Sequence, residues 1–210
     1  MPSPIKDPIP FLAPTSAVAS LQHFCAIAEA HRGFKICYDK LVVGDKIRVA
    51  SDLDVIIDET SRALIVELDR QSREGSIPLN QAIRDRFSNF LHDSGSVSRF
   101  ASQHGAKSDE RFDVPLSVFL QERSGNCATM AMVFQIAVQE RGKSSYFIQG
   151  VVSQSGNPAA YHAWNITDIG TPMVCDVALG QRGQFNGISM NDGFLDLQTP
   201  TIHGFQYSLN

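Results

Sequence analysis

The stretch from Cys127 to Arg141 is the feature that most narrows the folds open to this sequence. Its residues, CATMAMVFQIAVQER, carry apolar side chains at three- and four-residue intervals, which predicts a helix with a buried face. Asn126 or Ser124 can cap the start of this helix, and Gly142 is typical of a helix end. The thiol of Cys127 is therefore predicted to lie in the first helical turn, at the positive end of the helix dipole.

A cysteine in this position has two interpretations. The helix dipole favours thiolate over thiol, so Cys127 is a candidate nucleophile. Free cysteines are more often small buried apolar residues, and Cys127 alone does not decide between the two. The downstream sequence favours the nucleophile, because a histidine and then an aspartate follow on segments that are predicted to be strands.

Two short runs of alternating apolar residues predict a β-hairpin after the helix. The runs span residues 162–167 and 173–178, and the five residues between them include Gly170 and Pro172. A strand over residues 146–152 is expected to precede this hairpin.

The alternation also predicts which side chains share a face of the hairpin. If the turn is centred on Ile169, His162 lies directly opposite Asp176, close enough for the carboxylate to accept a hydrogen bond from the imidazole. Cys175 then points to the opposite face. An aspartate within an apolar run also needs a polar partner, and His162 would supply it.

This order of residues resembles the core of the transglutaminase-like superfamily, which shares the papain-like Cys-His-Asp/Asn arrangement. The resemblance rests on Gly125-x-Cys127 at the start of a helix, on His162-Ala163-Trp164 on a later strand, and on Asp176 on the next strand. In addition, residues 112–123 are similar to the short helix that precedes the nucleophile in that family.

The resemblance covers roughly residues 77–197 and is sharpest over 116–176. It implies an α+β, papain-like or transglutaminase-like fold, in which the helix that carries the nucleophile packs on an antiparallel sheet. It also implies that Cys127 is the nucleophile, His162 the general base and acid, and Asp176 the residue that orients the imidazole. No cofactor and no metal are expected.

The function that the resemblance implies is a thiol-dependent amide hydrolase acting on a protein or peptide substrate through a thioester. Glutamine deamidase, cysteine peptidase and transamidase all remain open. Two departures leave the substrate class undecided. Ala128 and Thr129 follow the nucleophile where the family often has an acidic residue, and Asp176 is followed by Val-Ala rather than x-Thr.

Three other interpretations are weaker. Arylamine N-acetyltransferases use a similar triad, but their Arg-Gly-Gly-x-Cys signature is replaced here by Arg-Ser-Gly-Asn-Cys. A non-catalytic binding module on the same fold is disfavoured because all three catalytic residue types are present. A metal site formed by Cys127, His162 and Cys175 is disfavoured because the predicted register turns Cys175 away.

Composition sets the remaining expectations. The sequence has 210 residues, of which 43% are hydrophobic, enough for one substantial core. We expect a single domain over residues 17–210 and a mobile, proline-rich tail over residues 1–16. The net charge of −4 and the scattered 18 Lys and Arg residues argue against a nucleic acid partner. The four cysteines lack the paired spacing of zinc clusters or disulfide frameworks.

The sequence also bears on localisation. No apolar run is long enough to span a membrane, and the first residues lack the basic and apolar blocks of a signal peptide. We expect a protein that is cytoplasmic at synthesis and that, if it acts as a bacterial effector, is exported without a cleaved signal peptide. The sequence does not indicate an oligomeric state.

Other segments carry weaker patterns. Helices are predicted over residues 17–30 and 79–92. Residues 34–49 and 55–68 are predicted to form strands or a short strand and helix, and the polar residues 93–113 a surface loop.

Overall fold

The computed structural model describes residues 17–107, 111–155, 157, 159–169, 171–191, 194–199, 202 and 204–209. The predicted tail, residues 1–16, lies outside this range. Chain contacts divide the protein into two compact units, each of which is described by itself. The first is built from the residues described within 1–39, 143–176 and 181–210, and the second from those within 40–142 and 177–180. A single domain over 17–210 stays a prediction.

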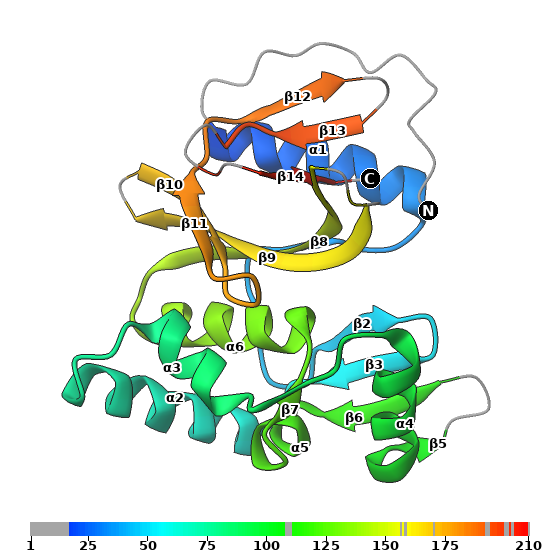
Figure 1. Ribbon diagram of the computed structural model, residues 1–210, viewed down its shortest axis with the longest axis vertical. Coiled ribbons are helices and arrows are strands. Elements are labelled where there is room, and N and C mark those ends of the chain that lie inside the picture. The colour runs from blue at the N-terminus through cyan, green and yellow to red at the C-terminus, as the bar shows by residue number, and fades with distance from the viewer. Residues whose placement is uncertain are drawn as a thin grey trace. The chain divides into compact units, whose positions relative to one another are not determined.

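The protein combines helices with a curled antiparallel sheet, which makes it an α+β protein as predicted. The first unit consists of helix α1 (Ala17–Arg32) and this sheet, whose described strands follow the order β11-β10-β9-β8-β14-β13-β12, with β1 also paired to β8 (Figure 1). The strands are β1 (Cys37–Tyr38), β8 (Ser144–Gln154), β9 (Ala160–Ile169), β10 (Thr171–Asp176), β11 (Gln181–Gln184), β12 (Ile188–Asn191), β13 (Phe194–Leu197) and β14 (Phe205–Ser208).

The core of the first unit lies between α1 and the sheet. The helix contributes Leu21, Cys25 and Ala28, which recur at three- and four-residue intervals and therefore share one face. The sheet and the residue that follows β11 contribute large side chains that are almost fully buried: Ile148, Trp164, Ile166, Val174 and Tyr207 from strands, and Phe185 after β11. Burial of this apolar surface fixes which face of β9 and β10 points inward.

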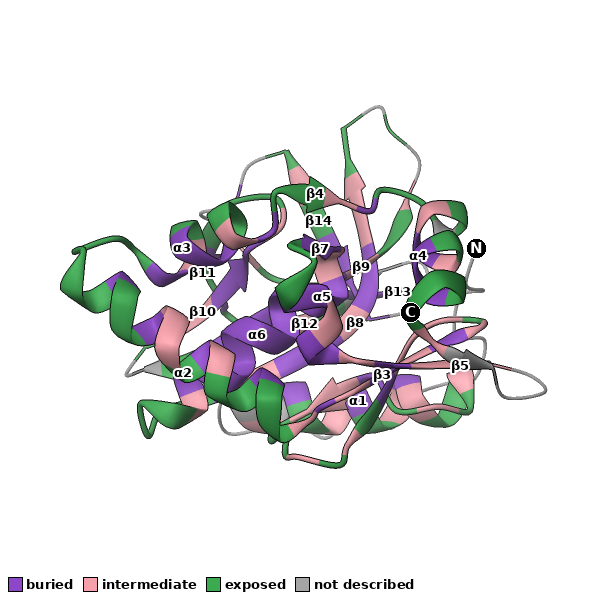
Figure 2. Cartoon of the chain, turned by 90° about the horizontal axis from the view of Figure 1, so that it is seen from below, coloured by how far each residue is buried: buried purple, intermediate pink, exposed green. Residues whose placement is uncertain are grey.

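The second unit is a group of helices with two small sheets. Its helices are α2 (Glu59–Glu74), α3 (Leu79–Arg86), α4 (Ser94–His104), α5 (Leu116–Gln121) and α6 (Cys127–Glu140). One sheet has the order β2-β3-β6-β5, formed by β2 (Lys46–Ala50), β3 (Leu53–Ile56), β6 (Phe112–Pro115) and β5 (Ala106–Lys107). The other pairs β4 (Asn89–Phe90) with β7 (Ser124–Gly125). Figure 2 shows that α6 is buried along most of its length.

The prediction of a surface loop over residues 93–113 is wrong. Helix α4 and strands β5 and β6 occupy most of that segment. The helix forms despite its serine and glycine content because the Asp93 carboxylate accepts from the N–H of Ser96 at 2.6 Å and completes a capping box. Val97, Phe100 and Ala101 are buried, and burial overrides weak helix propensity. The predicted helix over 79–92 is shorter than expected and ends at Arg86.

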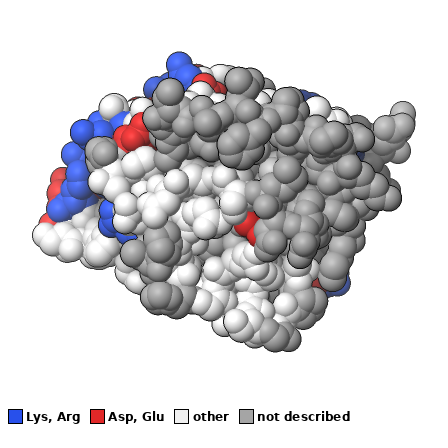
Figure 3. All heavy atoms as spheres, turned by 90° about the horizontal axis from the view of Figure 1, so that it is seen from above, with Lys and Arg blue, Asp and Glu red and all other residues white. Residues whose placement is uncertain are grey.

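Two further features bear on possible partners: the character of the helices and the distribution of charged side chains. In the part of the chain that the structure describes, no helix combines the length and the apolar character needed to cross a lipid bilayer. Figure 3 shows one face of the molecule, on which most of the described Lys and Arg side chains in view lie along one edge.

Candidate active site

Cys127 is the first residue of helix α6, as the sequence predicts. The cap is Asn126, whose side-chain oxygen accepts from the backbone N–H of Thr129 at 3.0 Å. The Thr129 hydroxyl accepts in return from the backbone N–H of Asn126 at 2.9 Å. This reciprocal pair fixes the first helical turn and holds the half-buried Cys127 at the positive end of the helix dipole.

Arg123 anchors the segment that leads into α6. Its backbone lies in the left-handed region, with φ of 53°, which costs a residue with a side chain roughly 1–2 kcal/mol. The Arg123 guanidinium donates to the carbonyl oxygens of Asp85 at 2.9 Å and Arg86 at 3.2 Å, at the end of α3. These bonds satisfy carbonyl groups that the helix leaves unpaired and offset the backbone strain.

Gly125 is required by the close packing next to the thiol. A Cβ atom at this position would lie 2.6 Å from Phe87 Cδ1 and 2.6 Å from the Thr129 hydroxyl oxygen. The absence of a side chain lets strand β7 approach both groups, and the carbonyl of Gly125 accepts from the N–H of Leu91 at 2.8 Å. The glycine two residues before Cys127 therefore has a steric role.

His162 and Asp176 lie together in the first unit. Nε2 of His162 is 2.6 Å from Oδ2 of Asp176, the geometry of a charge-assisted hydrogen bond in which the ring donates. The His162 side chain is 8% exposed and that of Asp176 is fully buried. A carboxylate that is buried away from water needs hydrogen-bond donors, and the His162 ring supplies one. The same hydrogen bond fixes the orientation of the imidazole ring.

The predicted register of the hairpin is wrong by two residues. Asn165 lies opposite Cys175 and Ile169 lies opposite Thr171, so the ladder continues into the residues predicted to form the turn. Asp176 is consequently a diagonal neighbour of His162 instead of its direct partner. A shift of two residues preserves the face of every side chain, and diagonal neighbours are still within reach of long side chains.

Two aromatic residues lie next to this pair. The hydroxyl of Tyr207, on β14, donates to the same Oδ2 of Asp176 at 2.9 Å. The ring of Trp164 stacks on His162, with centroids 6.3 Å apart and planes 19° apart, and packs edge-on against Tyr207 at 5.1 Å. The sequence gives no signal for Tyr207, which comes from a distant strand.

Gly150 makes room for this aromatic packing. It lies opposite His162 in the β8–β9 ladder. A Cβ atom on Gly150 would lie 2.5 Å from Cη2 of Trp164 and would also collide with the carbonyl oxygen of Ser208. The missing side chain leaves room for the indole ring beside the strand, and lets β14 approach β8.

The remaining cysteines have other surroundings. Cys175 lies on the opposite face of β10, as predicted, with its sulfur 3.9 Å from the hydroxyl oxygen of Thr167, and burial raises its pKa. A side-chain hydrogen bond with Cys37 raises the pKa of Cys25, and burial raises it further. No group of three or more His, Cys, Asp or Glu side chains suited to a metal ion occurs among the described residues.

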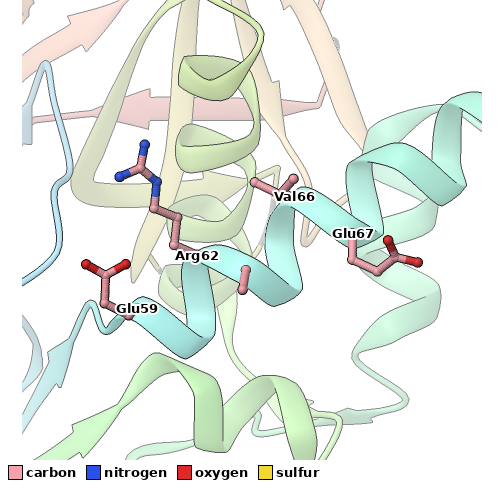
Figure 4. A pocket seen from close by; sticks show the side chains of 5 residues that line it. Glu59, Arg62, Val66 and Glu67 are labelled. Carbon is pink, nitrogen blue, oxygen red and sulfur yellow. The ribbon is translucent and has the colours of Figure 1, made fainter.

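The structure thus brings two of the three predicted site residues together. His162 and Asp176 belong to the first unit, whereas Cys127 belongs to the second. A shallow depression in the second unit is lined by Glu59, Arg62, Ala63, Val66 and Glu67, which project from successive turns of α2 (Figure 4). This depression contains none of the predicted site residues.

No family model matches the sequence, and no curated protein matches it.

Proposed function

We propose that this protein is a thiol-dependent amide enzyme with a papain-like, transglutaminase-like fold. In this proposal Cys127 is the nucleophile, His162 the general base and acid, and Asp176 the residue that orients the imidazole. The observation that carries it is the 2.6 Å hydrogen bond between His162 Nε2 and the fully buried Asp176 carboxylate. Such a carboxylate selects one tautomer of the ring and stabilises the imidazolium that forms during acyl transfer.

The position of Cys127 supports the same chemistry. A sulfur at the first position of a capped helix meets the positive end of the dipole, which favours thiolate. The N–H groups of the first helical turn have no carbonyl four residues earlier within the helix, and such groups bind anions. We assign the Cys127 N–H as one donor to the oxyanion of the tetrahedral intermediate.

The proposed reaction has two stages. The Cys127 sulfur attacks an amide carbonyl carbon, and the His162 ring holds the thiol proton. Because Nε2 is engaged by Asp176, Nδ1 is the ring nitrogen that exchanges this proton. The intermediate then collapses as the imidazolium protonates the departing amine, and a thioester remains. Water or a second amine releases the acyl group from the sulfur.

The proposed substrate is a protein or peptide. Attack on a main-chain amide followed by water makes the enzyme a peptidase, and attack on a glutamine side chain makes it a deamidase. A lysine acceptor gives transamidation. Hydrolysis is the favoured route, because the sequence carries no feature that marks an amine-acceptor site.

A bifunctional reagent tests whether the thiol and the imidazole act as a pair. The two electrophilic carbons of 1,3-dibromoacetone can join a thiolate to a nearby ring nitrogen. We expect one reagent molecule to link the peptides that contain Cys127 and His162, measured by mass spectrometry after digestion. Cys37→Ala, which removes another half-buried thiol, should form the same link. Failure of the wild-type protein to form it contradicts the proposal.

Intact-mass spectrometry of candidate protein substrates tests the reaction itself. A gain of about one dalton indicates deamidation, fragments indicate peptidase activity, and a crosslinked adduct indicates transamidation. We expect Cys127→Ala and His162→Ala each to abolish turnover, and the double variant to lose little more, because the residues act as a unit. A Cys127→Ala protein that retains most of the activity contradicts the thiol mechanism.

A further inference from the structure

We propose that Tyr207 is a positioning residue of this site, which acts on His162 through Asp176. The inference rests on the proposed function and extends it to a residue that the catalytic triad does not include.

The first support is the geometry of the shared oxygen. Oδ2 of Asp176 accepts from His162 Nε2 at 2.6 Å and from the Tyr207 hydroxyl at 2.9 Å. A carboxyl group held by one donor alone can rotate about its Cβ–Cγ bond. A second donor to the same oxygen limits that rotation, so the oxygen stays in line with the imidazole N–H.

The second support is the way in which Tyr207 is itself held. Its side chain is fully buried, and its ring packs edge-on against Trp164, which in turn stacks on His162. Strand β14 pairs with β8 at Tyr207 and Val152, so the backbone of Tyr207 is fixed in the interior of the sheet. A catalytic orientation is maintained when the supporting residues are locked by packing in this way.

The third support is the protonation of the phenol. Burial raises the pKa of Tyr207, and the neighbouring charge of Asp176 raises it further. The hydroxyl therefore keeps its proton at neutral pH and donates to the carboxylate there.

The test uses iodoacetamide as the probe, so that no substrate is needed. The rate of alkylation of Cys127 at about pH 6 reports how well the thiolate and imidazolium pair is formed. We expect Tyr207→Phe, which removes only the hydroxyl, to lower this rate by about tenfold. Tyr146→Phe removes a phenol hydroxyl from β8, where it accepts from Gln22, and should leave the rate within about twofold of wild type.

A double-mutant cycle separates positioning from general loosening of the fold. If Tyr207 acts through Asp176, Tyr207→Phe should change the alkylation rate by less than about twofold in an Asp176→Asn background. An equal loss in both backgrounds overturns the inference, as does a wild-type rate for Tyr207→Phe alone. If Asp176→Asn itself leaves the rate unchanged, the proposed triad fails, and this outcome is distinct from failure of Tyr207 alone.

If Tyr207→Phe does not fold, a measurement on the wild-type protein tests whether Tyr207 positions Asp176. Nuclear magnetic resonance of the wild-type protein should show a slowly exchanging Tyr207 hydroxyl proton with a nuclear Overhauser effect to the proton on His162 Nε2. A rapidly exchanging hydroxyl, or one without this contact, overturns the inference.

Discussion

Asp176 is the diagonal neighbour of His162 across the β9–β10 hairpin, and the two side chains still meet at 2.6 Å. Because the two residues are not directly opposite each other, the carboxylate extends along the ladder to accept the hydrogen bond from the imidazole ring. The contact therefore depends on the length and orientation of the two side chains, because the backbone pairing alone does not place them opposite each other.

This contact predicts separate effects of Asp176→Asn on rate and on stability. The amide keeps the shape of the carboxylate but removes the charge that stabilises the imidazolium. We expect the single-turnover rate to fall by about three to four orders of magnitude, with a melting temperature within a few degrees of wild type. Both are measured on the same preparation. A large loss of melting temperature with an unchanged rate would show that Asp176 is a structural charge.

The sequence predicts much of this site because its features are local. The cap at Asn126, the first-turn position of Cys127 and the faces of His162, Asp176 and Cys175 all follow from short patterns. Alternation fixes the face of each side chain but not the register, since every shift of two residues preserves it. For this reason the predicted direct opposition of His162 and Asp176 is wrong, although they share a face.

The parts that the sequence does not predict depend on distant contacts. Tyr207 lies 31 positions after Asp176 and reaches it only because β14 pairs with β8. Helix α4 is rich in serine and contains Gly95, residues of low helix propensity, and its burial depends on the rest of the second unit. Short local patterns carry no information about which distant segments will cover them.

The thiols predict a selective labelling pattern. At about pH 6 iodoacetamide should label Cys127 first, because it combines a helix N-terminus with partial exposure. Cys25 and Cys175 should react slowly, since their pKa values are raised and both side chains are buried. Peptide mapping after brief exposure measures the order. Preferential labelling of Cys25, Cys37 or Cys175 would contradict the assignment of Cys127 as the activated thiol.

Tyr207 also predicts how stability changes in alkali. Its pKa in the folded protein is raised above the ordinary value of 10.0. Above pH 10 the unfolded chain loses this proton while the folded protein keeps it, so the free energy of unfolding falls as pH rises. The stabilisation that Tyr207 contributes through its raised pKa is fully present below pH 10. Above pH 10 the free energy of unfolding falls by about 1 kcal/mol per pH unit. Urea titrations should show a shallower decline for Tyr207→Phe, and identical slopes would contradict this account.

The ion pair between Asp69 and Arg141 is expected to stabilise the C-terminal end of α6. Asp69 is buried on α2, and its carboxylate accepts from both Nε and Nη2 of Arg141, with Nε at 2.8 Å. We expect Arg141→Met to lower the free energy of unfolding by about 2 kcal/mol, because among the described residues it leaves the buried carboxylate with Arg73 alone as an ionic partner. Arg62→Met breaks the exposed pair with Glu140 and serves as the control, with an expected loss below about 1 kcal/mol. Equal losses in denaturant titrations would contradict the assignment.

The place of Tyr207 in the chain has a consequence for protein synthesis. A nascent chain that has left the ribosome only as far as Asp176 already contains α6 and Cys127, but it lacks β14 and the phenol. The imidazole and carboxylate therefore reach their final geometry only once residues 205–208 have been synthesised and have joined the sheet. Under the proposed chemistry, the thiol gains its full reactivity only after that point.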